Sequence, residues 1–343
     1  MLLSTQLQYG DDPIRNAEAV VAMEQVGLDV VWVAEAYSFD AVSLMGYLAA
    51  KTERVQIGSG ILPIYSRTPA LTAMTAAGLD ALSGGRMILG LGASGPQVIE
   101  GFHGVPYDKP VARTREIIEI CRKVWRRERL TNEGLYPIPL PEGQGTGLGK
   151  PLKLINHPLR ADIPVWVASL GDKNVEMTAE LANGWLPTVL MPEKLREVFG
   201  PALDAGTAKR APELGALQIT GGGILALEEE MFEPARQRAR GMLALYIGGM
   251  GARGRNFYNT VFRRQGYEDE AKLVQDLYLD GRKDEAAAAL PDDFVDKVTL
   301  IGSPSHVRER IAALREAGVT HLHVNPVGTE PLKLLAQVKE WIS

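Results

Sequence analysis

One pattern recurs along this chain and constrains its fold more than any other feature. A segment with the apolar spacing of an amphipathic helix ends in a small or turn residue, and two or three residues later a short apolar run begins. Six of these junctions are clear, and they lead into residues 30–34, 55–57, 87–91, 165–168, 185–189 and 321–324. With similar runs at residues 2–7 and 217–227, the sequence predicts eight strands.

Eight strands that alternate with helices predict an α/β fold. Short helix-to-strand joints and longer strand-to-helix exits favour a closed (β/α)8 TIM barrel over an open sheet. We expect one barrel domain over residues 1–343 with two insertions. Residues 129–157, after strand four, are rich in glycine and proline, and residues 228–305, after strand seven, are mostly helical in pattern. The first insertion is interpreted either as a mobile lid over the barrel mouth or as a plain surface loop.

The segment at residues 83–95 marks where a ligand is expected. Two glycines end a helix, an apolar strand follows, and further glycines line the carboxyl end of that strand, where ligands bind in α/β folds. Gly90, Gly92 and Gly95 also match the glycine pattern of dinucleotide-binding folds. However, Pro96 follows at once, and the region about 20 residues on has helical spacing instead of a strand that ends in an acid. These departures argue against a Rossmann site.

Composition excludes several classes of function. A formal net charge of −5 argues against nucleic acid as a main partner, because neutralising phosphates requires a basic face. Cys121 is the single cysteine, so the chain offers no disulfide or zinc framework. His157, His321 and His323 lack the spacing of metal ligands, and we expect no metal. Neither a signal peptide nor an apolar run long enough for a membrane span is recognised, so we expect a cytoplasmic protein without a membrane partner.

Three motifs, taken together with their order and spacing, carry a family resemblance. Residues 79–92, 164–171 and 182–185 resemble the bacterial luciferase-like superfamily, and within it the branch of coenzyme F420-dependent oxidoreductases. Residues 95–104 and 281–286 are similar to an actinobacterial subgroup whose substrates are mostly unassigned. The likeness covers nearly the whole chain.

The resemblance implies a deazaflavin, coenzyme F420, at the carboxyl face of the barrel and hydride transfer between its ring carbon C5 and a small organic substrate. It also implies a non-prolyl cis peptide bond behind the ring, which by position is Gly60–Ile61. The alternative is an ordinary strand end in which the glycines only make the turn out of the strand easier. Relatives bind the cofactor phosphate after strand five, where a helix starting near Asp172 would point its amides at the anion, although a simple N-cap by Ser169 or Asp172 is also possible. The implied cofactor-binding residues are Glu35, Ser59, Gly60, Ile61, Gly92, Ala93, Ser94, Ala168, Ser169, Leu170, Gly171 and Lys173.

The chain also differs from some members of the family that it resembles. Glu35 stands where relatives carry an acid beside the cofactor, but the next residue is Ala36, where the sugar-phosphate dehydrogenases of the family have a catalytic histidine. Met191 stands where those enzymes use a lysine for the substrate phosphate, which argues against glucose 6-phosphate. The candidates for the proton-transfer role are the polar groups near predicted strand ends: Glu35, Glu100 and His103, with Tyr37 beside them.

Two other functions stay open from the sequence. One is an FMN-dependent luciferase-like monooxygenase that receives reduced flavin from a separate reductase, and the other is a non-catalytic carrier of F420 or flavin. The resemblance further implies a homodimer. The apolar, glycine-rich residues 242–251 hint at such a contact, but they fit the wall of a substrate pocket equally well.

Overall fold

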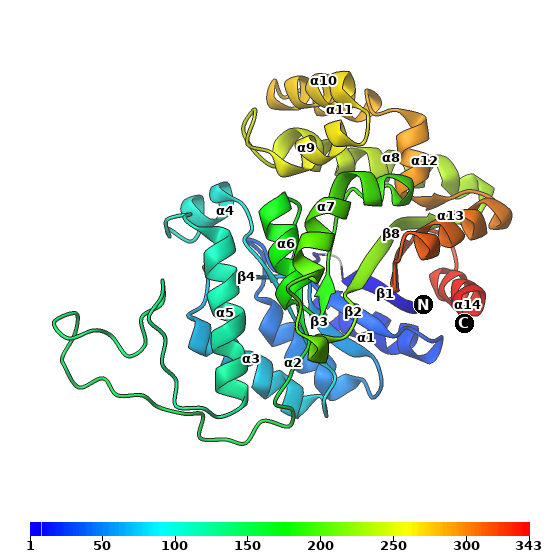
Figure 1. Cartoon of the computed structure of the whole chain (residues 1–343). Coiled ribbons are helices and arrows are strands. Elements are labelled where there is room, and N and C mark those ends of the chain that lie inside the picture. Colours follow the sequence, from blue (N-terminus) through cyan, green and yellow to red (C-terminus); the bar gives the residue numbers. More distant parts are fainter. Residues whose placement is uncertain (8) are drawn as a thin grey trace.

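The computed structural model describes residues 1–7 and 9–343, and within them eight parallel strands close into a barrel. The barrel is closed because its last strand pairs both with the first strand and with the barrel strand before it. Figure 1 shows helices packed around the strands. The predicted TIM barrel is therefore correct. Its strands are β1 (Leu2–Leu7), β2 (Val30–Val33), β3 (Gln56–Ser59), β5 (Met87–Gly92), β6 (Val165–Ala168), β7 (Gly184–Trp185), β8 (Gln218–Ala226) and β10 (His321–Pro326).

Two details of the strands differ from the expectation. The run predicted at residues 185–189 is a strand only over β7, because Pro187 has no N–H to donate to a neighbouring strand. Two short additional strands lie beside the barrel ends: β4 (Leu62–Pro63) pairs with β5, and β9 (Leu300–Ile301) pairs with β8.

Helices surround the barrel and start at residues that the sequence marks clearly. Side chains of Asp12, Asp40, Thr68 and Ser303 accept amide hydrogen bonds at helix starts, and proline opens most of these helices. No helix in the described part of the chain is both long and apolar enough to cross a membrane. The outer helices are α1 (Pro13–Gln25), α2 (Ala41–Lys51), α3 (Pro69–Leu82), α5 (Pro110–Trp125), α6 (Asp172–Leu181), α7 (Leu195–Thr207), α13 (Pro304–Glu316) and α14 (Pro331–Ile342), with the short α4 (Pro96–Gly101) after β5.

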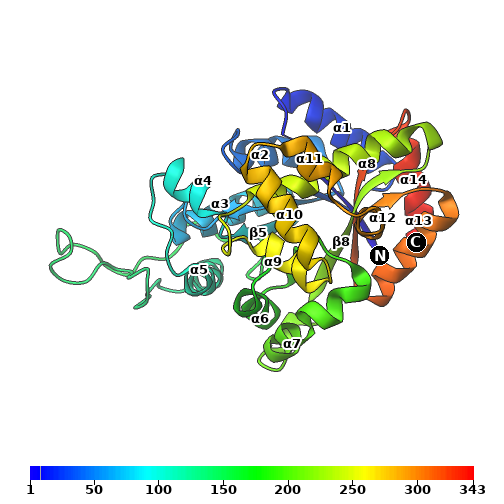
Figure 2. The ribbon, with the colours of Figure 1, turned by 90° about the horizontal axis from the view of Figure 1, so that it is seen from above.

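The segment between α5 and β6 forms an extended arm without a helix or strand in the described residues. A single antiparallel bridge joins Asn132 to Ile138 near its base. The arm runs away from the body on the side of α5 instead of over the carboxyl ends of the strands (Figures 1 and 2). Of the two interpretations of this insertion, the surface loop fits the structure and the lid does not.

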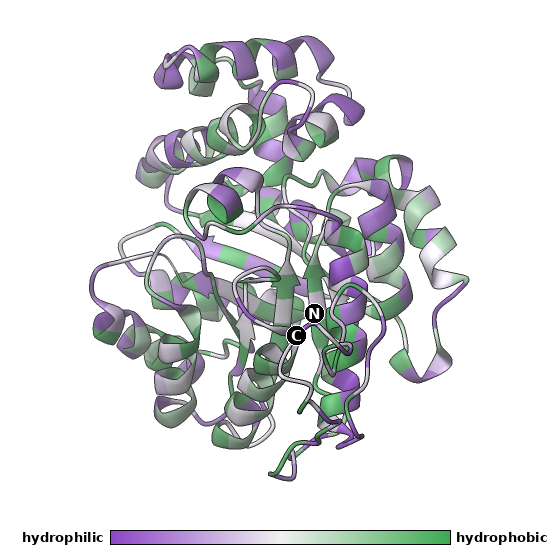
Figure 3. Ribbon diagram, turned by 90° about the vertical axis from the view of Figure 1, so that its left-hand side faces the viewer, coloured by the Kyte–Doolittle hydropathy of each residue, from purple (hydrophilic) through white to green (hydrophobic). Residues whose placement is uncertain are grey.

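The second insertion forms a helical layer over the carboxyl end of the barrel (Figures 1 and 2). It contains α8 (Glu229–Ala244), a π-helical segment η3 (Leu245–Gly249), α9 (Phe257–Arg264), α10 (Glu268–Leu279), α11 (Lys283–Ala288) and α12 (Asp292–Val298). Its apolar side chains form a second cluster together with Ile224 and Ala226 of β8, and within it Phe262 packs against Phe294. Figure 3 shows that the apolar residues lie mainly on the strands and the inner sides of the helices, while polar residues cover the outside.

Two tryptophans fill the barrel interior. Trp32 and Trp166 pack with their ring centroids 5.2 Å apart, together with Val30 and Ile88. The neighbouring strands make room for them with glycine: a Cβ on Gly58 would lie 2.4 Å from the Trp32 ring. Glycine is equally required at position 184 beside Trp166, where a Cβ would lie 2.1 Å from the indole. The two indoles therefore form a solid floor beneath the carboxyl ends of the strands.

Candidate active site

The carboxyl ends of β3, β5 and β6 lie side by side. The Gly60–Ile61 peptide bond is cis, as the family resemblance implied, and the chain then continues into β4 with Pro63 opposite Gly92. Gly92 in turn lies opposite Ala168. A Cβ on Gly92 would approach the Ile61 δ-methyl to 2.6 Å, so glycine is what allows this close contact. Three segments far apart in the sequence thus meet at one edge of the barrel.

Ser59 was predicted to bind a cofactor, but its side chain is used inside the barrel wall. Its hydroxyl donates to the Gly90 carbonyl oxygen at 2.8 Å and accepts from the Gly90 amide at 2.8 Å. The residue is fully buried. Ser59 therefore holds β3 to β5 and offers no free group to a ligand.

The start of α6 has the features of an anion site. Gly171 is its N-cap and supplies no side-chain hydrogen bond. The amides of Gly171, Asp172 and Lys173 have no acceptor in the part of the chain that the structure describes. These N–H groups and the positive end of the helix dipole suit a phosphate group. Leu170 is half-buried beside them, and Lys173 is exposed.

The alternative in which Ser169 or Asp172 caps α6 is wrong. The Ser169 hydroxyl is bonded to Thr178 Oγ1 at 2.8 Å, and its carbonyl oxygen accepts from the Trp185 indole at 2.9 Å. Ser169 is 4% exposed, so it anchors the loop from below and is not free for a phosphate. Asp172 faces the second insertion, where Arg264 donates to it at 2.7 Å.

Glu35 lies at the end of β2 but is fully engaged by protein groups. Arg67 binds both carboxylate oxygens, at 2.5 and 2.8 Å, and the Ala41 amide donates to Glu35 at 3.0 Å. The side chains of Glu35 and Arg67 are only 7% and 14% exposed. Hydrogen bonding to Glu35 raises the pKa of Arg67 above its usual value. This arrangement suits a positioning carboxylate and does not suit the proton donor that the sequence suggested.

The other predicted proton-transfer residues lie at the rim. Glu100 is exposed on α4 and accepts from the Tyr107 amide at 3.1 Å. The His103 ring meets Phe102 edge-on at 5.3 Å, and its buried Nε2 has no hydrogen-bond partner among the described residues. The Phe102 ring lies 6.2 Å from that of Tyr37, which follows β2.

The strand exit after β5 brings a further aromatic side chain to this rim. Ala93 is half-buried, and Ser94 adopts a left-handed conformation with φ of 57°. The carbonyl oxygen of Ser94 accepts from the Tyr107 hydroxyl at 3.4 Å. The backbone of Ser94 therefore helps to position the Tyr107 ring at the rim.

Tyrosines gather over the mouth, and sequence reasoning largely missed them. Partial desolvation, with the nearby Tyr246, Tyr37 and Glu35, raises the pKa of Tyr9 to about 12. Desolvation, followed by the proximity of Tyr246 and Tyr107, also raises the pKa of Tyr258. These side chains come from the loops after β1, β2 and β5 and from the second insertion. Only the fold reveals that such scattered residues are neighbours.

Several other residues singled out in the sequence lie outside this mouth. Met191 is buried in the apolar cluster of the second insertion, and its amide donates to Gln265 at 2.7 Å. Inside the barrel, burial lowers the pKa values of His321 and His323 to about 4, so both are neutral at pH 7. No group of three or more metal-ligating side chains occurs among the described residues.

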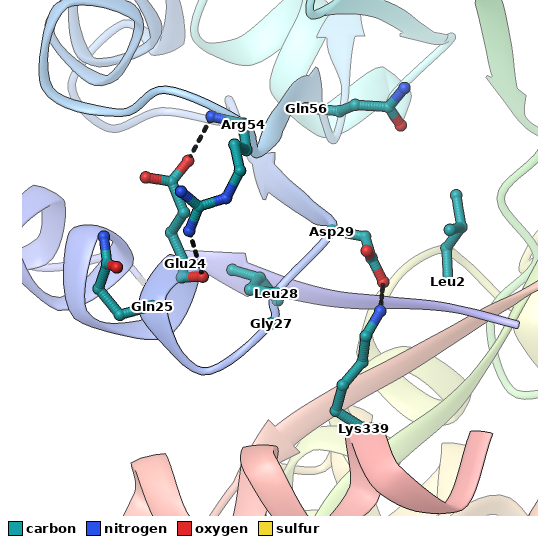
Figure 4. A pocket seen from close by; sticks show the side chains of 9 residues that line it. All are labelled: Leu2, Glu24, Gln25, Gly27, Leu28, Asp29, Arg54, Gln56 and Lys339. Atoms are coloured by element: carbon teal, nitrogen blue, oxygen red, sulfur yellow. Dashed lines mark hydrogen bonds and ion pairs between the residues drawn. The ribbon is translucent and has the colours of Figure 1, made fainter. Parts of the chain in front are cut away.

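A hollow of about 420 Å³ lies at the opposite, amino-terminal end of the barrel (Figure 4). Lys339 pairs with Asp29 at 2.6 Å, and Arg54 donates to the Glu24 carbonyl oxygen at 3.2 Å. The charged side chains named here are thus held by hydrogen bonds, and Lys339 and Asp29 form an ion pair. Because this end of a TIM barrel contributes stability and the carboxyl end carries the chemistry, we place the site at the carboxyl end.

Comparison with known protein families shows which family the chain belongs to. Residues 2–321 match the family described as luciferase-like monooxygenase. The chain belongs to the luciferase-like monooxygenase family. A relative from Mycobacterium tuberculosis, Rv3520c, provisionally named a coenzyme F420-dependent oxidoreductase, is 43% identical over 98% of both chains. The 5,10-methylenetetrahydromethanopterin reductase of Archaeoglobus fulgidus is 28% identical over 90% of this chain and 89% of its own.

One solved structure has the same fold. The coenzyme F420-dependent tetrahydromethanopterin reductase of Methanopyrus kandleri superposes with a TM-score of 0.80, at 21% identity, over 98% of this chain and 96% of its own. Like these luciferase-like relatives, the chain is an oxidoreductase.

Proposed function

We propose that this luciferase-like protein is an F420-dependent oxidoreductase that transfers a hydride between deazaflavin C5 and a small organic substrate. The observation that carries the proposal is the meeting of Gly60–Ile61, Gly92 and the uncapped start of α6 at one edge of the barrel. The relative that is 43% identical and named for F420 supports this cofactor. We further propose that the enzyme works in the cytoplasm, where its single, buried cysteine stays reduced.

The residues at this edge fit the parts of such a cofactor. The amides of Gly171, Asp172 and Lys173 would hold its phosphate, and the backbone around Ile61 and Gly92 would support its flat ring system. When bound, the deazaflavin supplies two-electron hydride exchange.

The chain's own groups then position and shield the reacting atoms. The Glu35–Arg67 pair fixes the loop after β2 against the turn before α3, and the Trp32–Trp166 floor excludes water from below. The helical layer of the second insertion covers the mouth from above (Figure 2).

Fluorescence titration with purified F420 tests the proposal. Quenching with a dissociation constant in the micromolar range is expected, whereas no complex at about 100 μM cofactor would contradict it. The family description favours one alternative, a monooxygenase that uses FMN, because the same helix start would accept the phosphate of FMN. Tighter binding of FMN than of F420, with oxygen-dependent turnover of reduced FMN, would favour that alternative.

We also propose that the protein is a homodimer that pairs through α3. Leu71, Met74 and Leu82 are 47%, 52% and 70% exposed, and their spacing puts them on one face of that helix. Gly78 lies between them with open space around it. A helix that is apolar on its outer as well as its inner side is normally covered by a partner.

A further inference from the structure

Tyr246 and Tyr258 form an aromatic pair that the second insertion holds over the carboxyl end of the barrel. Their ring centroids are 4.8 Å apart, with the planes inclined by 48°. Tyr246 lies in the π-helical segment η3, and Tyr258 lies in the first turn of α9. Segments of π-helix are rare and occur frequently at functional sites.

One buried asparagine fixes the backbone of both tyrosines. Asn256 Nδ2 donates to the carbonyl oxygens of Tyr246 and Ile247 at 2.9 and 3.0 Å. Asn256 Oδ1 accepts from the Asn259 amide at 3.1 Å and so caps α9, which carries Tyr258. Asn256 is 2% exposed. The relative position of the two rings is therefore set by a rigid support.

The π-helical segment is held from behind by a close contact with α10. A Cβ on Gly248 would lie 2.5 Å from Tyr278 Cβ, and one on Gly249 would lie 2.4 Å from the Tyr278 ring. These glycines allow η3 to lie directly on α10. Tyr278 therefore belongs to the support, on the other side of η3 from the mouth.

The pair lies beside the edge at which the cofactor is proposed to bind. Phe257, which precedes Tyr258, lies against Gly171 at the start of α6, where a Cβ would be 3.0 Å from Phe257 Cε1. On the other side, Tyr246 is close enough to Tyr9 to raise its pKa. Neither the Tyr246 nor the Tyr258 hydroxyl has a hydrogen-bond partner within residues 1–7 and 9–343. Two free phenol groups thus border the mouth.

Two carboxylates beside this wall are each held by an arginine, and the exposed Lys173 is a predicted cofactor-binding residue. Glu35 is bound by Arg67, and Asp172 is bound by Arg264. A charged substrate would leave its own charge without a partner here, which costs free energy in a largely desolvated site.

We propose that Tyr246 and Tyr258 are the specificity-determining wall of the site, and that they select a small uncharged substrate whose oxygen accepts a phenol hydrogen bond. The inference rests on the proposed function, since it places the cofactor beside the pair. Desolvation raises the pKa of both phenols, so they remain protonated donors at neutral pH.

Carbon-13 NMR of protein with tyrosine labelled at Cζ tests the placement without any turnover. Y246F and Y258F assign the two signals, and Y278F assigns the control signal from the supporting helix. On saturation with F420, the Tyr246 and Tyr258 signals are expected to move and the Tyr278 signal to stay. Fluorescence that reports F420 binding while both signals stay unchanged would overturn the inference and leave the proposed function intact; absence of binding would overturn both.

The substrate class is tested in the F420 complex with two probes of similar size, cyclohexanone and 4-oxocyclohexanecarboxylate. Cyclohexanone is expected to shift the two tyrosine signals, and loss of one hydroxyl in Y246F or Y258F is expected to weaken its binding about fivefold to tenfold. Binding of F420 by the same variants should stay within about twofold of wild type. Shifts with the carboxylate, or with neither probe, would overturn the proposed class.

Discussion

The carboxylate of Glu35 and the guanidinium of Arg67 form a two-point ion pair, at 2.5 and 2.8 Å, between the exit from β2 and the turn before α3. With the Ala41 amide as a third donor, Glu35 also anchors the start of α2. The pair therefore holds the loop after β2 to the turn before α3 at the wall of the mouth.

Removing either partner should destabilise the protein. Glu35→Ala is expected to lower the free energy of unfolding by about 2–4 kcal/mol, because Arg67 would stay largely buried without its partner. Urea denaturation of E35A, R67A and the double variant measures the coupling. R196A removes half of an exposed pair with Asp204 and serves as the control, expected to unfold at nearly the same urea concentration as wild type. Additive effects of E35A and R67A would contradict the arrangement.

The two glycines of β5 should respond differently to an added methyl group. A Cβ on Gly90 would lie 1.8 Å from the Ser59 carbonyl oxygen, so Gly90→Ala is expected to disrupt folding. Gly92→Ala displaces the end of Ile61 only, and it should fold while binding F420 at least about tenfold more weakly. Gly241→Ala, in α8 with open space around it, is the control and should raise stability by about 0.5–1 kcal/mol. Unchanged F420 affinity in G92A would contradict the placement of the ring.

The buried histidines should make stability fall in mild acid. Burial lowers the pKa values of His321 and His323 to about 4 from the ordinary 6.5, so the unfolded chain binds more protons than the folded one between these values. Each histidine then removes up to about 1.4 kcal/mol of stability per pH unit as pH falls from 6.5 to 4. Urea denaturation at pH 7, 6 and 5 should show a shallower decline for H323N, while H157N, at an exposed position, should follow wild type. Equal slopes for wild type and H323N would contradict the prediction.

Charge on the outer face of α3 should separate the proposed dimer. L71E together with M74E is expected to give a monomer by light scattering after size exclusion, since two carboxylates would be buried at the contact. L148E with I155E, on the exposed arm, is the control and should leave the oligomeric state unchanged. A wild-type monomer, or an unaltered dimer in the α3 variant, would contradict the proposal.

The barrel could be predicted from the sequence because its signals are local. Runs such as residues 165–168 are apolar and bounded by turn residues, and Thr68 or Ser303 marks a helix start by its side chain alone. The cis bond at Gly60–Ile61 came from the family resemblance. Pro187 shortened β7 because a missing N–H outweighs an apolar run.

The site could be predicted only in part, because side-chain roles depend on contacts that sequence spacing does not encode. Ser59 and Ser169 stand at the expected strand ends, yet their hydroxyls bond to Gly90 and Thr178 inside the wall. Tyr246 and Tyr258 reach the mouth only because the second insertion folds back over the barrel. The run at residues 242–251 allowed a pocket wall that includes Tyr246, but no local pattern indicates that Tyr258 packs beside it.

The most direct measurement compares the binding of F420 with that of its deazaflavin ring fragment lacking the phosphate-bearing tail. If the ring lies against Gly60–Ile61 and Gly92 while the amides at the start of α6 hold the phosphate, F420 should bind in the micromolar range and the fragment at least about tenfold more weakly. Equal affinities would contradict the phosphate anchor, and failure of both to bind at about 100 μM would contradict the account as a whole.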